Sequence, residues 1–419
     1  MPLQRIFRIS LLILALCPPT AGAAGPALDD RSSLVTHVLA LLDERIGLMP
    51  DVAAAKWIAH QPVGDPAREA QVVASFGELV SSYGLARSPS EALMRLEINA
   101  ARDVQTSHLD RWSQEGKGPD VAPSLQDEIR PKIDRITREL ASALYLAAPF
   151  LDSEELSAQV AQLPAQHWSE PHQRALTNAL RNVRLETPRT TDRLKRSGHL
   201  RVGVPADYAP FAWQEDQHLV GADIDLIEEI AGPLGLKPIY IRSSWSTLLD
   251  DLAADHFDIA IGGISVNEKR RERAGFSISL VTGGKTAIGR CSDVARFSIA
   301  ENIDQEGIRV IENPGGTNEI FARKHLQHAR LTVHIDNISI FDELALGHAD
   351  VMYTDDFEVS RVARRYPTLC RLLEATFEPA DKAILLPLSD DWPGVFNPVV
   401  APVVEQHKYL EFLTRAIAR

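Results

Sequence analysis

The feature that most constrains the fold is a change in the sequence pattern near residue 190. Before it, over residues 27–185, apolar residues recur at helical spacing, with almost no alternation of β-branched residues. One such stripe contains Leu34, Val38, Leu41 and Arg45. After residue 190, short apolar strands alternate with helices, a pattern typical of parallel α/β layers. The sequence therefore predicts a multidomain chain, with an all-α helical domain followed by an α/β domain.

Turn and cap signals divide the two patterns into elements. In the first half they predict a helix that begins at Asp65-Pro66, and further helices at 88–112, 133–148, 153–162 and 171–183. In the second half they predict strands at 200–204, 238–241 and 257–261, with helices at 225–232 and 246–254. The polar, proline-containing stretch 187–191 is interpreted as a linker. The predicted domains are therefore 24–187 and 188–419.

The first 23 residues have the features of a secretory signal. Two arginines precede an apolar run at 9–16 that is too short to span a bilayer, and a small-residue cleavage site ends at Ala23. We therefore expect a signal peptide at 1–23 and a periplasmic or secreted mature protein without membrane contact. Cys17 suggests lipidation as an alternative, which the bulky Leu16 before it disfavours.

Charge and cysteine usage narrow the choice of partners. The formal net charge of −13 argues against binding to nucleic acid or to an anionic membrane. A small anionic substrate must then meet a local cluster of Arg and Lys. The histidines show no metal-ligand spacing, so we predict neither a metal nor a cofactor. Cys291 and Cys370 remain after signal cleavage, and we predict a disulfide between them in an oxidising compartment, with two buried free thiols as the alternative.

Basic residues lie on faces of the predicted helices that should point inward. Arg45 lies on the apolar stripe of the first helix, and Lys56, eleven residues later, returns to nearly the same face. Two inward cations are costly to bury unless something anionic pairs with them. Arg68 follows at the start of the next helix, where Asp65 and Glu69 add carboxylates. The pattern favours a site for a small anion.

The string Lys56-x5-Pro62-Val63-x-Asp65-x2-Arg68-Glu69 is the most specific feature of this half. Gln105, on an inward stripe of the third helix, and Arg130, at the start of the fourth, extend it. The segment from about 28 to 185 thereby resembles the AroQ-type, all-helical chorismate mutases, in particular the secreted subclass. The resemblance implies conversion of chorismate to prephenate. That rearrangement needs no nucleophile and depends on positioning and on charge stabilisation at the ether oxygen.

The resemblance also implies roles for individual residues. Arg45 and Arg130 would hold the substrate carboxylates, whereas Lys56 and Gln105 would donate hydrogen bonds to the ether oxygen. One residue departs from the family pattern, because position 101 is alanine where relatives often carry a hydroxyl group that contacts a carboxylate.

Three more residues complete the implied mutase site. Arg68 would support the residues that contact substrate, and Asp65 and Glu69 would engage the ring hydroxyl region. The alternative is a helical docking module whose charges are solvated.

Two motifs of the second half are typical of proteins that close two lobes over a small molecule. They are Gly221-x-Asp223-x-Asp225 and Ile264-Ser265-Val266-Asn267-Glu268-Lys269-Arg270. Over about residues 194–419 the chain resembles the type 2 periplasmic-binding-protein fold. In that fold the arginine that matches Arg270 grips a carboxylate bidentately, and Ser265 would share it. This resemblance alone favours a nutrient-binding protein or a sensor domain.

More specific strings resemble the periplasmic cyclohexadienyl dehydratases, which convert prephenate to phenylpyruvate. They are Ser244-Trp245, Gly284-Lys285-Thr286, Asn313-Pro314-Gly315-Gly316-Thr317-Asn318-Glu319 and Lys382-Ala383-x-Leu385-Leu386-Pro387. The backbone N–H groups at 315–317 predict an anion site that binding proteins share. Glu319 distinguishes an enzyme, because a proton donor is needed to expel the ring hydroxyl as water.

The resemblance places Trp245, Lys285 and Thr317 at the lining of the second site. Asp355 matches the position that meets an α-amino group in amino-acid binders, which would allow arogenate as a second substrate. Since the product of the first domain is the substrate of the second, we expect a bifunctional enzyme. A chorismate mutase fused to a non-catalytic domain for transport or sensing is the alternative. The secreted mutases are usually dimeric, so a homodimer through the helical domain is expected.

Overall fold

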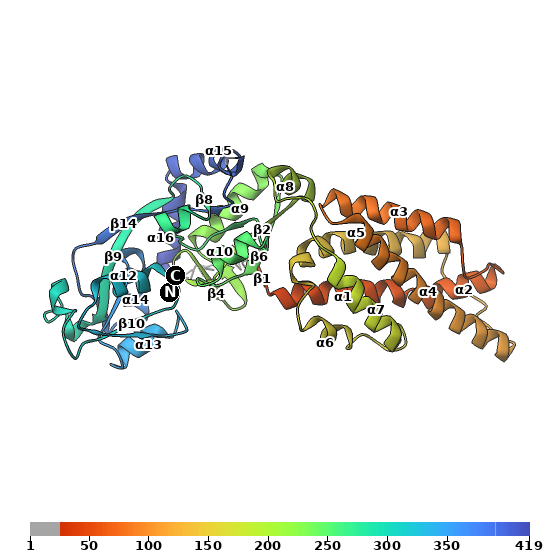
Figure 1. Ribbon diagram of the computed structural model, residues 1–419, viewed down its shortest axis with the longest axis horizontal. Helices are drawn as coiled ribbons and strands as arrows, with labels where there is room; N and C mark the ends of the chain where they lie inside the picture. Colours follow the sequence, from red (N-terminus) through yellow and green to blue (C-terminus); the bar gives the residue numbers. More distant parts are fainter. Residues whose placement is uncertain (1–25, 390) are drawn as a thin grey trace, which may run out of the picture.

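The computed structural model describes residues 26–389 and 391–419. The predicted signal peptide at 1–23 and Cys17 lie outside the described residues. The molecule is elongated, with a helical part and an α/β part that meet end to end (Figure 1). Among the described residues, no helix is both long enough and apolar enough to cross a membrane.

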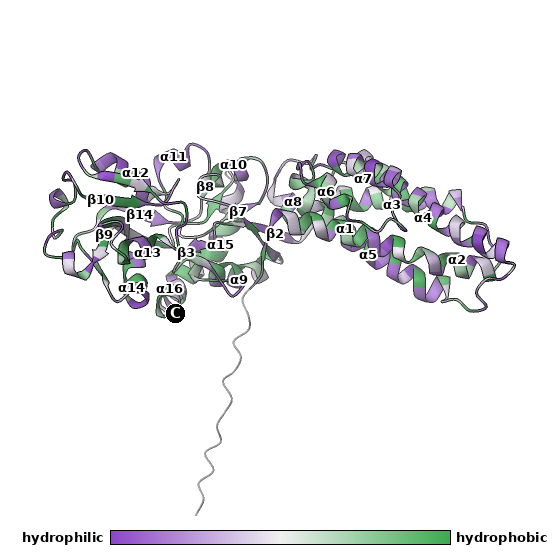
Figure 2. Ribbon diagram, turned by 90° about the horizontal axis from the view of Figure 1, so that it is seen from below, coloured by the Kyte–Doolittle hydropathy of each residue, from purple (hydrophilic) through white to green (hydrophobic). Residues whose placement is uncertain are grey.

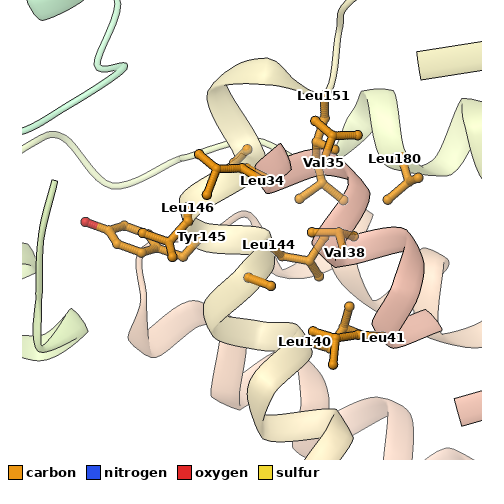
Figure 3. Packing of buried hydrophobic residues seen from close by; sticks show 14 of the residues in the cluster. Leu34, Val35, Val38, Leu41, Leu140, Leu144, Tyr145, Leu146, Leu151 and Leu180 are labelled. Atoms are coloured by element: carbon orange, nitrogen blue, oxygen red, sulfur yellow. The ribbon is translucent and has the colours of Figure 1, made fainter. Parts of the chain in front are cut away.

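The helical part is a bundle with apolar residues at its centre (Figure 2). Its helices are α1 (Arg31–Gly47), α2 (Met49–Ile58), α3 (Pro66–Ser82), α4 (Arg87–Glu115), α5 (Arg130–Ala147), α6 (Leu156–Val160) and α7 (Glu170–Asn182). The predicted apolar stripe is confirmed, since Leu34, Val38 and Leu41 of α1 are buried against Leu140 and Leu144 of α5 (Figure 3). Burying side chains of this size contributes about 1.5–3 kcal/mol each and fixes the two helices side by side.

Local signals account for the helix ends that matter to the first site. Asp65 is the N-cap of α3, because its Oδ1 accepts the Arg68 backbone N–H at 3.1 Å, and Pro66 occupies the first helical position. Helix α4 ends where Gly116 adopts a left-handed conformation with φ of 64°. The long α4 packs against α2, α3 and α7.

The α/β part consists of two lobes, each with its own sheet. The first sheet has the order β1 (Leu28–Asp29), β6 (Lys237–Arg242), β2 (His199–Val204), β7 (Ile259–Ala260), β15 (Leu385–Leu386) and β8 (Gly275–Phe276). The second has the order β11 (Arg330–Val333), β10 (Arg309–Glu312), β12 (Val351–Asp355), β9 (Val281–Arg290) and β13 (Leu369–Arg371), with β14 (Phe377–Lys382) also paired to β9. A smaller sheet contains β3 (Asp207–Tyr208), β4 (Ala212–Glu215) and β5 (His218–Val220).

Helices flank both sheets. Those of the first lobe are α8 (Thr191–Ser197), α9 (Ala222–Leu234), α10 (Leu248–Ala253), α11 (Glu268–Arg271), α15 (Asp391–Glu405) and α16 (Lys408–Ala418), and those of the second are α12 (Thr317–His325), α13 (Ile340–Ala345) and α14 (Asp356–Arg365). The predicted parallel strands are confirmed, because β2 pairs in parallel with β6 and β7. The chain enters the second lobe through β9 and returns through β14, so two strands connect the lobes.

The junction between the two parts has a feature that the sequence did not reveal. Strand β1, which precedes the first helix, pairs in parallel with β6 of the α/β part, with Leu28 opposite Tyr240. The Leu219 backbone N–H also donates to the Pro26 carbonyl at 2.8 Å. Two residues are too few to give a periodic signal. The chain therefore begins, among the described residues, as an edge strand of the first lobe.

Side chains of both parts also pack together at the junction. Tyr145 of α5 points away from the bundle core (Figure 3), and the Arg201 guanidinium lies 5.0 Å from the centre of its ring. Arg201 is buried and forms an ion pair with Asp258 at 2.7 Å. Arg201 also pairs with Asp255 at 2.5 Å, and Arg193 lies 3.7 Å from Asp258, so the pair belongs to a buried network of charges at the junction.

The predicted disulfide between Cys291 and Cys370 is confirmed, and it links the end of β9 to β13. We expect thiol titration of the exported protein, denatured without reductant, to find no free thiol. The cross-link spans 79 residues, so reducing it should lower the free energy of unfolding by about 4 kcal/mol, since the unfolded chain regains conformational freedom. Two titratable thiols would contradict this prediction.

Candidate active sites

The helical part contains a cavity of about 850 Å³ between α2, α3, α4 and α5. All seven residues that the sequence predicted for this half line it: Arg45, Lys56, Asp65, Arg68, Glu69, Gln105 and Arg130. The residues are up to 85 positions apart in the chain, and the packing of five helices, α1 to α5, brings them together. The cavity is large enough for a small dicarboxylic acid.

Lys56 and Gln105 form the centre of this site. The Lys56 Nζ donates to Gln105 Oε1 at 3.0 Å and also to the Val63 carbonyl. The Gln105 Nε2 in turn donates to the Ala101 carbonyl at 3.2 Å. Burial lowers the pKa of Lys56, although the nearby Glu69 and Asp65 partly oppose this effect. An ammonium group has three donors, so one N–H of Lys56 remains for a ligand.

Arg45 lines the cavity and is held there by an ion pair with Glu97, a residue that sequence reasoning missed. Its Nη1 lies 2.9 Å from Oε1 of Glu97, and both side chains are buried. Burial raises the pKa of Glu97, which Arg45 partly offsets. Glu97 lies eight residues before Gln105, with Ala101 halfway between, and this helical spacing was a signal for it.

Glu69 is also fixed by a partner that was missed. Arg102 Nε donates to its Oε1 at 2.9 Å, and the Asp65 backbone N–H donates to the same oxygen at 3.2 Å. Arg68 is exposed, and its Nη1 donates to Gln71 at 2.9 Å. Asp65 and Arg68 therefore line the rim of the cavity, whereas Glu69 is held toward Arg102.

Two further residues of α5 line the cavity beside Arg130. Asp134 and Arg138 follow it at intervals of four residues, so the three side chains lie on one helix face. This spacing was a readable signal. It adds a second arginine, Arg138, to the part of the cavity wall that α5 forms.

The pH dependence of this site follows from its donors. Gln105 donates N–H groups at every pH, and Lys56 must stay protonated to donate to an anionic ligand. We expect a mutase rate that is nearly flat between about pH 5 and 8. Above that range the rate should fall as Lys56 loses its proton. Because burial lowers the pKa of Lys56, this loss should occur at a lower pH than is usual for lysine. A steep loss between pH 5 and 8 in folded protein would contradict this assignment.

The second site lies between the two lobes and is a narrow cleft with a volume of about 30 Å³. Five residues that the sequence predicted line it: Trp245, Ser265, Arg270, Thr317 and Asp355. Tyr208, Asn318 and Lys382 also line it and were not among the predicted residues. Lys382 is the first residue of the segment 382–386, whose other residues are all apolar. A lysine in such a segment is expected to be buried, and buried lysines are rare unless they have a partner, so this was a signal for a site residue.

Asp355 is at the centre of the cleft and is buried. Its Oδ1 accepts from Lys285 Nζ at 2.6 Å, and its Oδ2 accepts from Lys382 Nζ and from the Tyr208 hydroxyl, the latter at 2.6 Å. Burial raises the pKa of Asp355, but Lys382 and Lys285 outweigh that effect and hold it well below its usual range. Both oxygens of Asp355 are therefore already bound by cations.

Arg270 is the third cation of the cleft. It is buried, its Nη1 donates to the Ser265 carbonyl at 2.7 Å, and burial lowers its pKa to about 10. Lys382 Nζ donates to the Ser265 hydroxyl at 2.8 Å. Lys285, also predicted to line the cleft, is not among the lining residues and reaches the cleft only through Asp355. Three cations thus lie around a single lining carboxylate, that of Asp355, which leaves an excess of positive charge that favours an anionic ligand.

Glu319 lies on the first turn of α12, beside the cleft residues Thr317 and Asn318. Its Oε2 accepts the Gly315 backbone N–H at 2.8 Å, and its Oε1 accepts from Arg323 Nε at 2.9 Å. Burial raises its pKa, but these two hydrogen bonds outweigh burial and leave the pKa below its ordinary value. The structure therefore places Glu319 next to the cleft without bringing its carboxylate among the lining groups.

Comparison with known proteins finds relatives for both parts. Residues 36–106 match the family model for chorismate mutase type II, and residues 200–386 match that for bacterial extracellular solute-binding proteins, family 3. The chain is 46% identical over 198 residues to a cyclohexadienyl dehydratase of Pseudomonas aeruginosa, which covers 47% of this chain and 74% of that protein. It is 26% identical over 174 residues to a secreted chorismate mutase of Mycobacterium tuberculosis, which covers 40% of this chain and 84% of that protein.

A solved structure supports the same fold for the second half. An ancestral amino-acid-binding protein, described as a precursor of cyclohexadienyl dehydratase, aligns with a TM-score of 0.50 and 25% identity. The alignment covers 54% of this chain and all of that structure. The predicted two-lobed periplasmic-binding-protein fold is confirmed.

Proposed function

This chain belongs to the cyclohexadienyl dehydratase family through its C-terminal half, which follows a type II chorismate mutase domain, and we propose that it is an exported bifunctional enzyme. It converts chorismate to prephenate in the helical part and prephenate to phenylpyruvate in the cleft of the α/β part. One observation carries the proposal: a single chain holds two separate cationic sites, one in a cavity of about 850 Å³ and one in a cleft of about 30 Å³, whose lobes must part to admit a dicarboxylate. The product of the first site is the substrate of the second.

In the helical site, catalysis depends on positioning and on charge. Arg45 and Arg130 hold the two carboxylates of chorismate in the reactive conformer. The remaining N–H of Lys56 and an amide hydrogen of Gln105 stabilise the charge that develops on the ether oxygen as its C–O bond breaks. Lys56 is held in place by Gln105 and by the Val63 carbonyl, so little reorganisation is needed.

In the cleft, Arg270, Lys285 and Lys382 bind the carboxylates of prephenate. The ring carboxylate leaves as CO₂, its bonding electrons make the ring aromatic, and the ring hydroxyl leaves with one added proton as water. Glu319 supplies that proton. A dianionic substrate raises the pKa of a nearby carboxylic acid, which supports proton uptake by Glu319 once substrate is bound.

The state of Asp355 bears on the choice between prephenate and arogenate. An α-ammonium group would compete with Lys285 and Lys382 for this carboxylate. We therefore propose prephenate as the preferred substrate and arogenate as a weaker one. A homodimer through the helical part is proposed from the likeness to secreted mutases.

Supplying prephenate alone tests the second activity against its main rival. We expect phenylpyruvate and CO₂ to appear in equal amounts, over many turnovers per protein molecule. A solute-binding protein would instead form a complex and leave prephenate unchanged. The fold alone allows both outcomes.

A further inference from the structure

The N-terminus of α1 reaches across the junction to the first lobe. Arg31 Nη2 donates to Oδ1 of Asp251 at 2.7 Å, and the Arg31 guanidinium lies 5.4 Å from the centre of the Phe150 ring. Asp251, on α10, is 4% exposed. The helical part therefore supplies one of the cations that hold a buried carboxylate of the α/β part.

Asp251 ties several segments together. Its Oδ2 accepts from the hydroxyls of Ser243 at 2.7 Å and Thr247 at 2.8 Å, and its Oδ1 also contacts His256 Nδ1 at 2.8 Å. The segment 243–247 has no regular strand or helix, and both of its ends are thus bound to the same carboxylate. A charged acceptor makes such hydrogen bonds stronger than those between neutral groups.

The segment 243–247 shapes the cleft. It carries Trp245, which lines the cleft and donates from Nε1 to Asp207 Oδ1 at 2.8 Å. Trp245 also packs edge-on against Tyr208, with 5.9 Å between ring centres. The backbone of Ser246 abuts Gly315 of the other lobe so closely that an added Cβ would come within 2.9 Å of it.

We propose that Arg31 is a positioning residue for the cleft: through Asp251 it fixes the segment 243–247 and with it Trp245. The helical part then acts as a support for the second active site as well as the source of its substrate. This inference rests on the proposed function in one respect only: its kinetic test assumes that the cleft dehydrates prephenate. Arg45, in the first site, belongs to the same helix, so α1 connects the first site to the contact with Asp251.

The kinetic test uses the full chain with Arg31→Met. We expect KM for prephenate to rise about threefold to tenfold with kcat within about twofold, the range typical of coupling through packed contacts. Mutase activity should be unchanged, which also shows that the helical part of the variant is folded. Arg31→Lys should restore part of the loss. Asp30→Asn is the matched control, because Asp30 pairs with Arg242 across the same junction at 3.0 Å without touching Asp251.

A spectroscopic readout separates this inference from the proposed function. In protein labelled with fluorotryptophan, Trp245→Phe identifies the Trp245 signal among six tryptophans, and Arg31→Met should shift that signal without substrate. An unchanged KM overturns the inference, whether the variant loses thermal stability or not, and so does an unchanged Trp245 signal. If wild-type protein binds prephenate without turnover, the proposed dehydratase fails, and the dissociation constant replaces KM in the same comparison.

Discussion

Glu319→Gln is expected to lower kcat for prephenate dehydration about 10²- to 10⁴-fold, the usual cost of removing a general acid. Glutamine has nearly the same shape and can still accept from the Gly315 N–H, so the loop before α12 should keep its conformation. It cannot deliver a proton to the departing hydroxyl. Removing a negative charge beside a dianion should leave prephenate affinity equal or tighter. Steady-state kinetics and calorimetric binding measure the two effects separately.

The matched control is Glu378→Gln, an exposed carboxylate of the same lobe that pairs with Lys324. It should leave kcat unchanged. The mutase rate of the Glu319 variant should also equal that of the wild type, because the two sites are separate. Near wild-type dehydration by Glu319→Gln would show that another group is the acid. Asp355 would not be that acid, because Lys285 and Lys382 keep its carboxylate ionised. The ammonium groups of Lys285 and Lys382 would then be the candidate proton donors.

Lys56→Ala is expected to lower the mutase kcat about 10²- to 10³-fold, as removal of one donor to a developing negative charge does elsewhere. The change removes the charged donor and leaves Gln105 Oε1 without its partner. The amide group of Gln105 can then rotate, so the loss should fall on kcat more than on KM. Dehydration of added prephenate should stay at the wild-type rate.

Lys132→Ala is the control for that change. Lys132 lies on α5 near Arg130, is exposed and does not line the cavity. Loss of activity by both variants would indicate a general electrostatic effect of removing positive charge. A Lys56→Ala enzyme within about threefold of wild type would exclude Lys56 as the donor to the ether oxygen.

Much of the fold followed from local signals in the sequence. The change near residue 190 predicted the order of the two architectures, and the N-cap at Asp65 and the glycine after α4 set helix ends as expected. The cost of burying charge correctly predicted that Arg45 and Lys56 share a site. The helical spacing between them was not the reason, since Arg45 lies on α1 and Lys56 on α2, with a turn at Leu48 between the two helices.

What could not be predicted depends on contacts between distant segments. The pairing of β1 with β6 involves two residues, and nothing in Leu28 or Asp29 indicates a partner some 210 positions away. The ion pairs of Arg45 with Glu97 and of Asp355 with Lys382 are also decided by packing. Glu319 lies beside the cleft and not within it. Its carboxylate is bound by Arg323, one helical turn later, and a motif match does not reveal this ion pair.

A time course with chorismate as the sole substrate tests the central claim most directly. Purified mature protein is mixed with chorismate, and chorismate, prephenate and phenylpyruvate are followed together. We predict that chorismate falls, prephenate rises and then falls, and phenylpyruvate accumulates to the amount of chorismate consumed. Prephenate that accumulates without being consumed, or chorismate that persists, would contradict the account of two successive active sites on one chain.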